Sequence, residues 1–182
     1  MRIIFVHLMC VFALSVRPAR AADDVAMPLL PSAIEAAEDL RRYLEMMLRR
    51  SATFRQQCLR LEAPRLRVQI RRDAQFYDKP YQARTTIQRS AGSIVASVVI
   101  TAFGDPTEWL AHEFEHVIEQ IEGVNLRQVM QAREGAWQTV EGSFETTRAI
   151  RAGETVRQEV RERHRALARA AAGPESGGRA HD

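Results

Sequence analysis

The first third of the chain repeats apolar side chains every three or four positions, the spacing of one face of an α-helix. The repeat extends from residue 32 to residue 59. It opens on Ser32 and Glu35, a capping-box pattern, and therefore predicts one long N-terminal helix. Pro64 ends this region. Residues 66–70 then alternate apolar and polar side chains, which predicts a strand exposed on one face.

Two β-prone runs follow a loop that is predicted over residues 73–81. They cover residues 83–89 and 94–101, and the Ser-Ala-Gly-Ser segment between them predicts a hairpin. The second run is almost entirely apolar, which favours the most buried position in a sheet. We therefore expect a small, mostly antiparallel sheet after the N-terminal helix.

The next helix has the clearest boundaries in the sequence. Asp105 suits the N-cap, Pro106 suits the first helical position and Glu108 completes a capping box. Gly123 suits the position just after the helix, which is therefore predicted over residues 105–122.

Two further helices are predicted, a weaker one over residues 125–132 and a last one over residues 144–170. The Gly- and Pro-containing end of the chain, residues 170–182, predicts a disordered tail. Helices around one small sheet indicate an α+β fold, which we place in a single domain over residues 32–169.

The helix over residues 105–122 turns by 100° per residue and presents three faces. The first face is apolar, the second is acidic and expected to be solvated, and the third carries two histidines. The apolar face consists of Leu110, Phe114, Val117 and Ile121, with Ile118 at its edge. The acidic face consists of Glu108, Glu115, Glu119 and Glu122. The third face consists of Trp109, His112, Glu113, His116 and Gln120. Both histidines therefore project away from the apolar stripe.

The N-terminus has the pattern of a secretory signal peptide. Arg2 precedes an apolar run over residues 3–16, and Ala19-Arg20-Ala21 is a small-x-small cleavage pattern. We predict a signal peptide over residues 1–21 and a mobile leader over residues 22–31. The apolar run is shorter than the roughly 20 residues of a membrane-spanning helix. The expected product is a periplasmic or secreted protein with no membrane span after cleavage.

Signal cleavage changes the charge of the protein. The signal segment holds three of the 26 basic residues and none of the 23 acidic ones, so the mature chain has a net charge of zero. A nucleic-acid partner is not expected, because it would need an excess of basic residues. Cys58, the one cysteine after residue 21, cannot form an internal disulfide, and we interpret it as a half-buried structural thiol.

The two histidines are the main candidates for chemistry. Histidines at positions i and i+4 of a helix lie one turn apart, so His112 and His116 can bind one zinc ion through imidazole nitrogens. Glu113 lies beside such a site without binding the metal, where it can act as a general base towards a water molecule that zinc activates. The alternative is a solvated helix surface on which two histidines coincide.

The motif His112-Glu113-Phe114-Glu115-His116 resembles the zinc-binding motif of the zincin metallopeptidases, which share a helix–sheet–helix core. The resemblance implies that His112 and His116 bind zinc and that Glu113 is the general base. The metzincin branch requires a Gly and a third His shortly downstream, which this chain lacks. The closer resemblance is to gluzincins, in which a glutamate on a later helix is the third ligand.

The third ligand can be sought on the last predicted helix. Its apolar stripe includes Val156 and Val160, and Glu145 falls inside that stripe. A carboxylate on a core-facing stripe needs a partner such as a cation. Glu145 is therefore the preferred ligand, Glu141 one turn earlier is its rival, and Glu134 and His164 are weaker alternatives. A first-turn glutamate favoured by the helix dipole would have the same position without a metal.

Some roles remain open in the sequence. Trp109 shares the face of the histidines, where it suits a pocket wall or the core equally. Arg148 suits a contact to a ligand or substrate carboxylate, or the surface. Gluzincin peptidases also use a Tyr or His to stabilise the oxyanion, and no motif here matches one, which leaves Tyr77, Tyr81 and His164 as unranked candidates.

The leading hypothesis is an exported zinc-dependent peptidase or amide hydrolase that acts on a peptide or protein substrate. The hairpin strands over residues 83–101 are the expected edge along which an extended peptide aligns. One alternative is a non-enzymatic binding or envelope-assembly protein that keeps the zinc core as a scaffold. Another is a metal-free helical interaction domain, for which the motif would be a coincidence.

Overall fold

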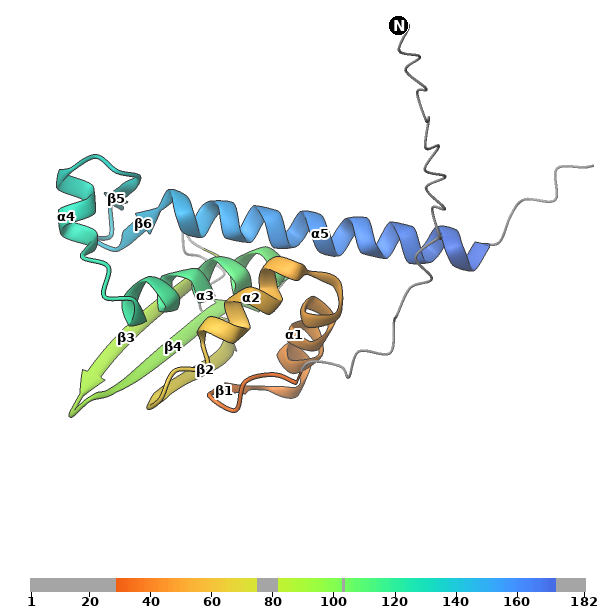
Figure 1. Ribbon diagram of the computed structural model, residues 1–182, viewed down its shortest axis with the longest axis horizontal. Coiled ribbons are helices and arrows are strands. Elements are labelled where there is room, and N and C mark those ends of the chain that lie inside the picture. The colour runs from red at the N-terminus through yellow and green to blue at the C-terminus, as the bar shows by residue number, and fades with distance from the viewer. Residues whose placement is uncertain (1–28, 75–81, 103, 173–182) are drawn as a thin grey trace, which may run out of the picture.

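The computed structural model describes residues 29–74, 82–102 and 104–172, which form a mixed α+β fold (Figure 1). The predicted signal peptide, most of the predicted leader, residues 75–81 of the predicted loop and the tail after residue 172 lie outside the described residues. Among the residues described, no helix has the length and apolar character needed to cross a membrane.

Four strands form the main sheet: β1 (Ile34–Ala36), β2 (Leu66–Asp73), β3 (Ala83–Ser90) and β4 (Ser93–Thr101). Their order is β1-β2-β4-β3; β1 and β4 run parallel to β2, and β3 runs antiparallel to β4. The expectation of a mostly antiparallel sheet is therefore wrong. The almost entirely apolar β4 takes an interior position beside β2, as expected of the most buried strand, and this places β3 at the edge.

The predicted hairpin is confirmed. Strands β3 and β4 are joined by Ala91 and Gly92, whose φ angles of 42° and 80° are both positive, as a two-residue type I′ turn requires. Side chains along β3 alternate between half-buried and exposed up to Ile87. Among the residues described, β3 has no strand on its outer side, so its backbone edge is open.

The predicted long N-terminal helix is wrong in two respects. Residues 34–36 pair with β2 as a strand, so Ser32 and Glu35 do not form a capping box. The helical part is divided into α1 (Glu38–Arg50) and α2 (Ala52–Arg60) by Ser51, whose backbone is extended. The Ser51 hydroxyl caps α2 by accepting a hydrogen bond from the Phe54 N–H group at 2.9 Å.

The core lies between the sheet and the helices that cover one of its faces. Phe54 of α2 stacks on Phe114 with ring centroids 5.4 Å apart. Cys58 is buried beside them in the same cluster, more deeply than the half-buried position expected, and its burial raises the pKa of the thiol to about 12, with the Glu62 carboxylate adding to the shift. It is a structural thiol, because the reactive thiolate is disfavoured.

The predicted motif helix is α3 (Thr107–Ile121). Pro106 takes the N-cap position that was expected for Asp105, so the helix begins one residue later than predicted. The Asp105 carboxylate still accepts a hydrogen bond from the Thr107 N–H group at 3.0 Å. Glu108 pairs instead with Arg157 of the last helix, so the capping box is absent. Gly123 follows the helix with a φ of 74°, the left-handed conformation expected at that position.

The chain beyond α3 contains a short helix, α4 (Leu126–Gln131), a small ribbon of β5 (Ala136–Gln138) and β6 (Phe144–Thr146), and the long helix α5 (Thr147–Ala172). The last helix was predicted to begin at residue 144, but residues 144–146 form β6, and residues 170–172 of the predicted tail are helical. Figure 1 shows α1, α2 and α3 on one side of the main sheet, with α5 lying across these helices.

The close crossing of α5 and α3 depends on Gly153. A Cβ atom at this position would lie 2.8 Å from the Glu108 carbonyl oxygen and 3.3 Å from the His112 Cβ atom. Gly153→Ala is expected to destabilise the fold by about 1–3 kcal/mol through overpacking, although alanine is the better helix former. Urea unfolding checks this, with Ala166→Gly on the exposed part of α5 as the control for helix propensity. A more stable Gly153→Ala variant would contradict the close crossing.

Candidate metal centre

Two histidines project from the same face of α3, one helical turn apart. His112 is buried and His116 is partly buried. Their ring centroids lie 4.9 Å apart with the ring planes nearly perpendicular, at 79°. The face that carries them is turned away from the apolar stripe of α3, as the spacing of the residues predicts.

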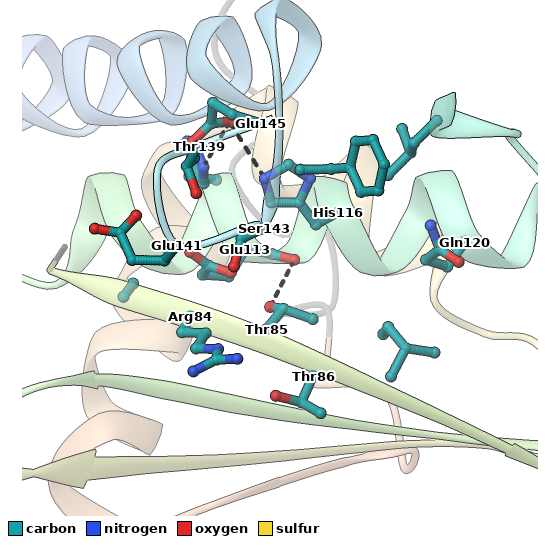
Figure 2. Close-up of a pocket in the computed structure, with 15 residues that line it drawn as sticks. Arg84, Thr85, Thr86, Glu113, His116, Gln120, Thr139, Glu141, Ser143 and Glu145 are labelled. Atoms are coloured by element: carbon teal, nitrogen blue, oxygen red, sulfur yellow. Dashed lines mark hydrogen bonds and ion pairs between the residues drawn. The ribbon is translucent and has the colours of Figure 1, made fainter. Parts of the chain in front are cut away.

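Glu145 lies opposite the histidines, on β6. Its Oε1 atom is 3.3 Å from the Nε2 atom of His112 and 3.3 Å from the Nε2 atom of His116 (Figure 2). The Thr146 N–H group donates to the same oxygen at 2.8 Å, which fixes its direction. The expectation that Glu145 lies on a helix is wrong, because the carboxylate is presented by a strand.

The other predicted ligands do not reach the histidines. Glu141 lines the same pocket, as Figure 2 shows, but the three-residue donor cluster contains Glu145 instead. Glu134 lines a separate hollow between α4 and α5. His164, on the far part of α5, bonds to Arg50 through its Nδ1 atom.

The donor set fits a zinc ion. Among the residues described, two imidazole nitrogens and one carboxylate oxygen lie within 4.8 Å of one another. Ligand bonds of about 2.0–2.2 Å at tetrahedral angles separate neighbouring donors by roughly 3.3–3.5 Å. The two nitrogen-to-oxygen distances of 3.3 Å agree with that separation. A catalytic zinc has three protein ligands and one open position, and three is the number found here.

The carboxylates of the cluster hold positive charge at the site. Burial lowers the pKa of His116, but the Glu119 and Glu145 carboxylates outweigh it and raise that pKa to about 10. Burial raises the pKa of Glu145, but hydrogen bonds from His112 and His116 outweigh it and hold that pKa well below its usual range. Without a metal the site therefore keeps an ionised carboxylate against a proton on His116, which a divalent cation would displace.

Glu113 is buried beside the histidines and does not belong to the donor cluster. Its burial raises the pKa of its carboxyl group, against the opposing effect of His116 and His112. A carboxylate with a raised pKa accepts a proton more readily near neutral pH. The Thr85 hydroxyl donates to the Glu113 backbone carbonyl at 3.5 Å, which ties this part of α3 to the edge strand β3.

A cavity of about 390 Å³ opens in front of these side chains. The edge strand β3 borders one side, α3 forms the floor and the β5–β6 ribbon borders the other side (Figure 2). Residues from all of these elements, and Leu126 of α4, line it: Ala83, Arg84, Thr85, Thr86, Ile87, His112, Glu113, His116, Gln120, Leu126, Thr139, Glu141, Ser143, Phe144 and Glu145.

Two hydroxyl-bearing residues of this cavity, Thr139 and Ser143, were not predicted from the sequence. The register of the ribbon pairs Trp137 with Glu145, and Thr139 with Ser143 follows it, so these side chains share one face. Thr139 and Ser143 therefore stand beside Glu145. The Thr139 Oγ1 atom is inaccessible to solvent and has no hydrogen-bond partner in the structure. Strands of three residues have no periodic pattern, so the sequence held no signal for this face.

The acidic face predicted to be solvated is largely covered. Glu115 is only 4% exposed and accepts hydrogen bonds from Gln57 at 2.7 Å, Arg60 at 3.1 Å and Arg148 at 2.6 Å. Glu119 is only 2% exposed. The expectation of a solvated face is wrong because α2, α5 and Thr146 of β6 pack against it.

Four weaker candidates lie away from the cavity or outside the described residues. Arg148 pairs with Glu115 and Glu122, so it contacts no member of the donor cluster. Trp109 packs against the core, with its ring centroid 6.3 Å from that of His112. Tyr77 and Tyr81 lie outside the residues that the structure describes.

Comparisons of the chain with protein-family models, with curated proteins and with solved structures gave no match. The chemistry of the site therefore rests on its own geometry: three convergent donors, a buried carboxylate beside them and a cavity bordered by an open strand edge.

Proposed function

We propose that the chain is an exported zinc-dependent peptidase or amide hydrolase of the gluzincin type. The observation that carries the proposal is the convergence of His112, His116 and Glu145, with Glu113 beside them at the same cavity. The motif on α3, which resembles the zincin motif, supports this assignment, and the mixed α+β fold is compatible with a zincin-like core.

In this proposal each side chain has a separate task. His112, His116 and Glu145 hold the zinc ion. When bound, zinc acts as a Lewis acid that activates a water molecule and polarises the scissile carbonyl. Glu113 takes a proton from the attacking water and then passes it to the leaving amide nitrogen. Its buried position keeps this proton transfer away from bulk solvent.

The open edge of β3 offers a means of aligning the substrate. Residues 83–87 of β3 line the cavity along its length, and β3 is the outermost strand of the sheet. An extended peptide can add to such an edge through backbone hydrogen bonds, which places a peptide carbonyl over the donor cluster. This role belongs to β3 alone, because β4, which was included in the expected edge, is paired on both sides.

Thr139 is the proposed oxyanion-stabilising residue, which no sequence motif identified. Thr139 lines the cavity, and its buried hydroxyl has no hydrogen-bond partner in the structure; turned toward the cavity, that hydroxyl would donate to the oxyanion that forms during attack. A hydrogen bond to a charged group contributes about 1.5–3 kcal/mol. Thr139→Val is therefore expected to lower kcat by roughly 10- to 100-fold with little change in KM, and Thr139→Ser to retain most of the activity. Equal loss in both variants would contradict this role.

A peptide-library cleavage assay on the zinc-loaded chain tests the proposed function. We expect cleavage that a chelator abolishes and that added zinc restores. A chain that binds one zinc ion but cleaves no peptide or amide would overturn the hydrolase proposal and favour the non-enzymatic scaffold. A chain that retains no metal would overturn the site as well, leaving the metal-free interaction domain.

A further inference from the structure

The Glu119 carboxylate is buried in α3 with both of its oxygens bonded. Its Oε2 atom lies 3.0 Å from the Nδ1 atom of His116, and its Oε1 atom accepts a hydrogen bond from the Thr146 hydroxyl at 2.8 Å. Glu119 and Thr146 are 2% and 3% exposed, so water does not compete for these bonds. One carboxylate thus joins α3 to the last residue of β6.

Thr146 is the neighbour of Glu145 and connects to it directly. Its backbone N–H group donates to the Glu145 Oε1 atom at 2.8 Å. Its hydroxyl accepts from the Ala149 N–H group at 3.0 Å, in the first turn of α5. A continuous set of hydrogen bonds therefore runs from His116, through Glu119 and Thr146, to the carboxylate of Glu145 and the start of α5.

The bond between Glu119 and His116 has a definite consequence for the imidazole. A carboxylate at the Nδ1 atom holds a proton there, so the Nε2 atom, which lies 3.3 Å from the Glu145 oxygen, is the nitrogen that can give up its proton and bind a metal ion. The same partner restricts rotation of the ring and increases the basicity of the free nitrogen. Both effects prepare that nitrogen for a metal ion.

We propose that Glu119 is a positioning residue, which orients His116 directly and fixes the Glu145 strand through Thr146. The inference rests on the proposed zinc site. It adds that the site is assembled before the metal arrives, because Glu119 and Thr146 already make these four hydrogen bonds without a metal. Outer partners of metal ligands typically contribute 10- to 100-fold in metal affinity.

Glu115 offers a matched control on the same helix. It is a glutamate one turn before Glu119, it is similarly buried, and both of its carboxylate oxygens also accept hydrogen bonds. Its partners are Gln57, Arg60 and Arg148, none of which is a candidate ligand. Loss of charge at Glu115 therefore reports the general cost of disturbing a buried carboxylate in α3.

Zinc affinity, measured by competition with a chromophoric chelator on the full chain, distinguishes a positioning role of Glu119 from a purely structural one. We expect Glu119→Gln to weaken zinc binding about 10- to 100-fold, and Thr146→Val to weaken it less, with Thr146→Ser near wild type. Glu115→Gln is expected to bind zinc as wild type does, whatever its effect on unfolding. The absorption bands of bound Co²⁺ should shift in Glu119→Gln and stay unchanged in Glu115→Gln.

Wild-type affinity and an unchanged Co²⁺ spectrum in Glu119→Gln would overturn the inference while leaving the zinc site in place. So would equal weakening in Glu115→Gln and Glu119→Gln, because the effect would then be structural. If Glu119→Gln does not fold, the comparison of Thr146→Val with Thr146→Ser decides, and equal affinities would count against it. Absence of zinc binding by the wild-type chain would instead refute the proposed function on which the inference depends.

Discussion

Glu145→Ala is expected to weaken zinc binding by more than about 10³-fold, because it removes one of the three protein donors found among the described residues, a larger loss than that of an outer partner. The remaining nitrogens of His112 and His116 would then face an enlarged cavity instead of an oxygen 3.3 Å away. Zinc content after dialysis, together with chelator competition, measures the change.

Glu141→Ala is the control for this loss. Glu141 lines the same cavity and carries the same charge, but it does not belong to the donor cluster. Its removal changes the electrostatic field of the site without removing a donor, so near-normal zinc affinity is expected. The opposite pattern, with zinc lost in Glu141→Ala and kept in Glu145→Ala, would contradict the assigned third ligand.

Glu113→Gln should separate catalysis from metal binding. The substitution keeps the shape of the side chain but removes the base, and loss of general acid–base catalysis typically costs 10²- to 10⁴-fold in rate. We therefore expect peptide hydrolysis to fall by about that factor while one zinc ion per chain is retained. Steady-state hydrolysis of a peptide found in the library assay gives the rate, and elemental analysis of the same sample gives the zinc content.

A second result would distinguish this role from a structural one. Because Glu113 is buried, its variant is checked by urea unfolding against wild type, and unchanged stability is expected when the shape is kept. A Glu113→Gln variant that folds, binds zinc and hydrolyses the peptide at the wild-type rate would remove Glu113 from the mechanism.

The part of the site on α3 could be predicted because its geometry is local. His112, Glu113 and His116 belong to one helix whose boundaries are marked by Asp105 and Gly123, so helical periodicity alone places them on one face. The hairpin of β3 and β4 was predictable for the same reason, since its turn residues and strand patterns lie next to each other in the sequence.

Long-range packing determines the features of the fold that local sequence patterns did not predict. Ile34 joins the sheet because it pairs with Val68, although its neighbours suit a helix, and tertiary contacts outweigh such local preferences. Ser51 interrupts the first helical repeat with a single extended residue, which periodicity does not detect. The pairing of β4 with β2 likewise depends on contacts that no local pattern encodes.

Glu145 and Glu119 show two different limits of structure prediction from sequence patterns. The prediction of Glu145 extends the apolar stripe of the last helix backwards, but Glu145 lies on the three-residue strand β6, so the prediction names the right residue on the wrong element. Glu119 was placed on a solvated face because periodicity divides a helix into faces without showing which of them is covered. Contacts with Thr146 from β6 cover it here.

Anomalous diffraction at the zinc absorption edge, from crystals of the wild-type chain grown with one equivalent of zinc, tests whether His112, His116 and Glu145 bind one zinc ion. We expect one strong peak about 2.0–2.2 Å from the Nε2 atoms of His112 and His116 and from a carboxylate oxygen of Glu145, with no fourth protein ligand. A peak elsewhere, or no peak between α3 and β6, would contradict it.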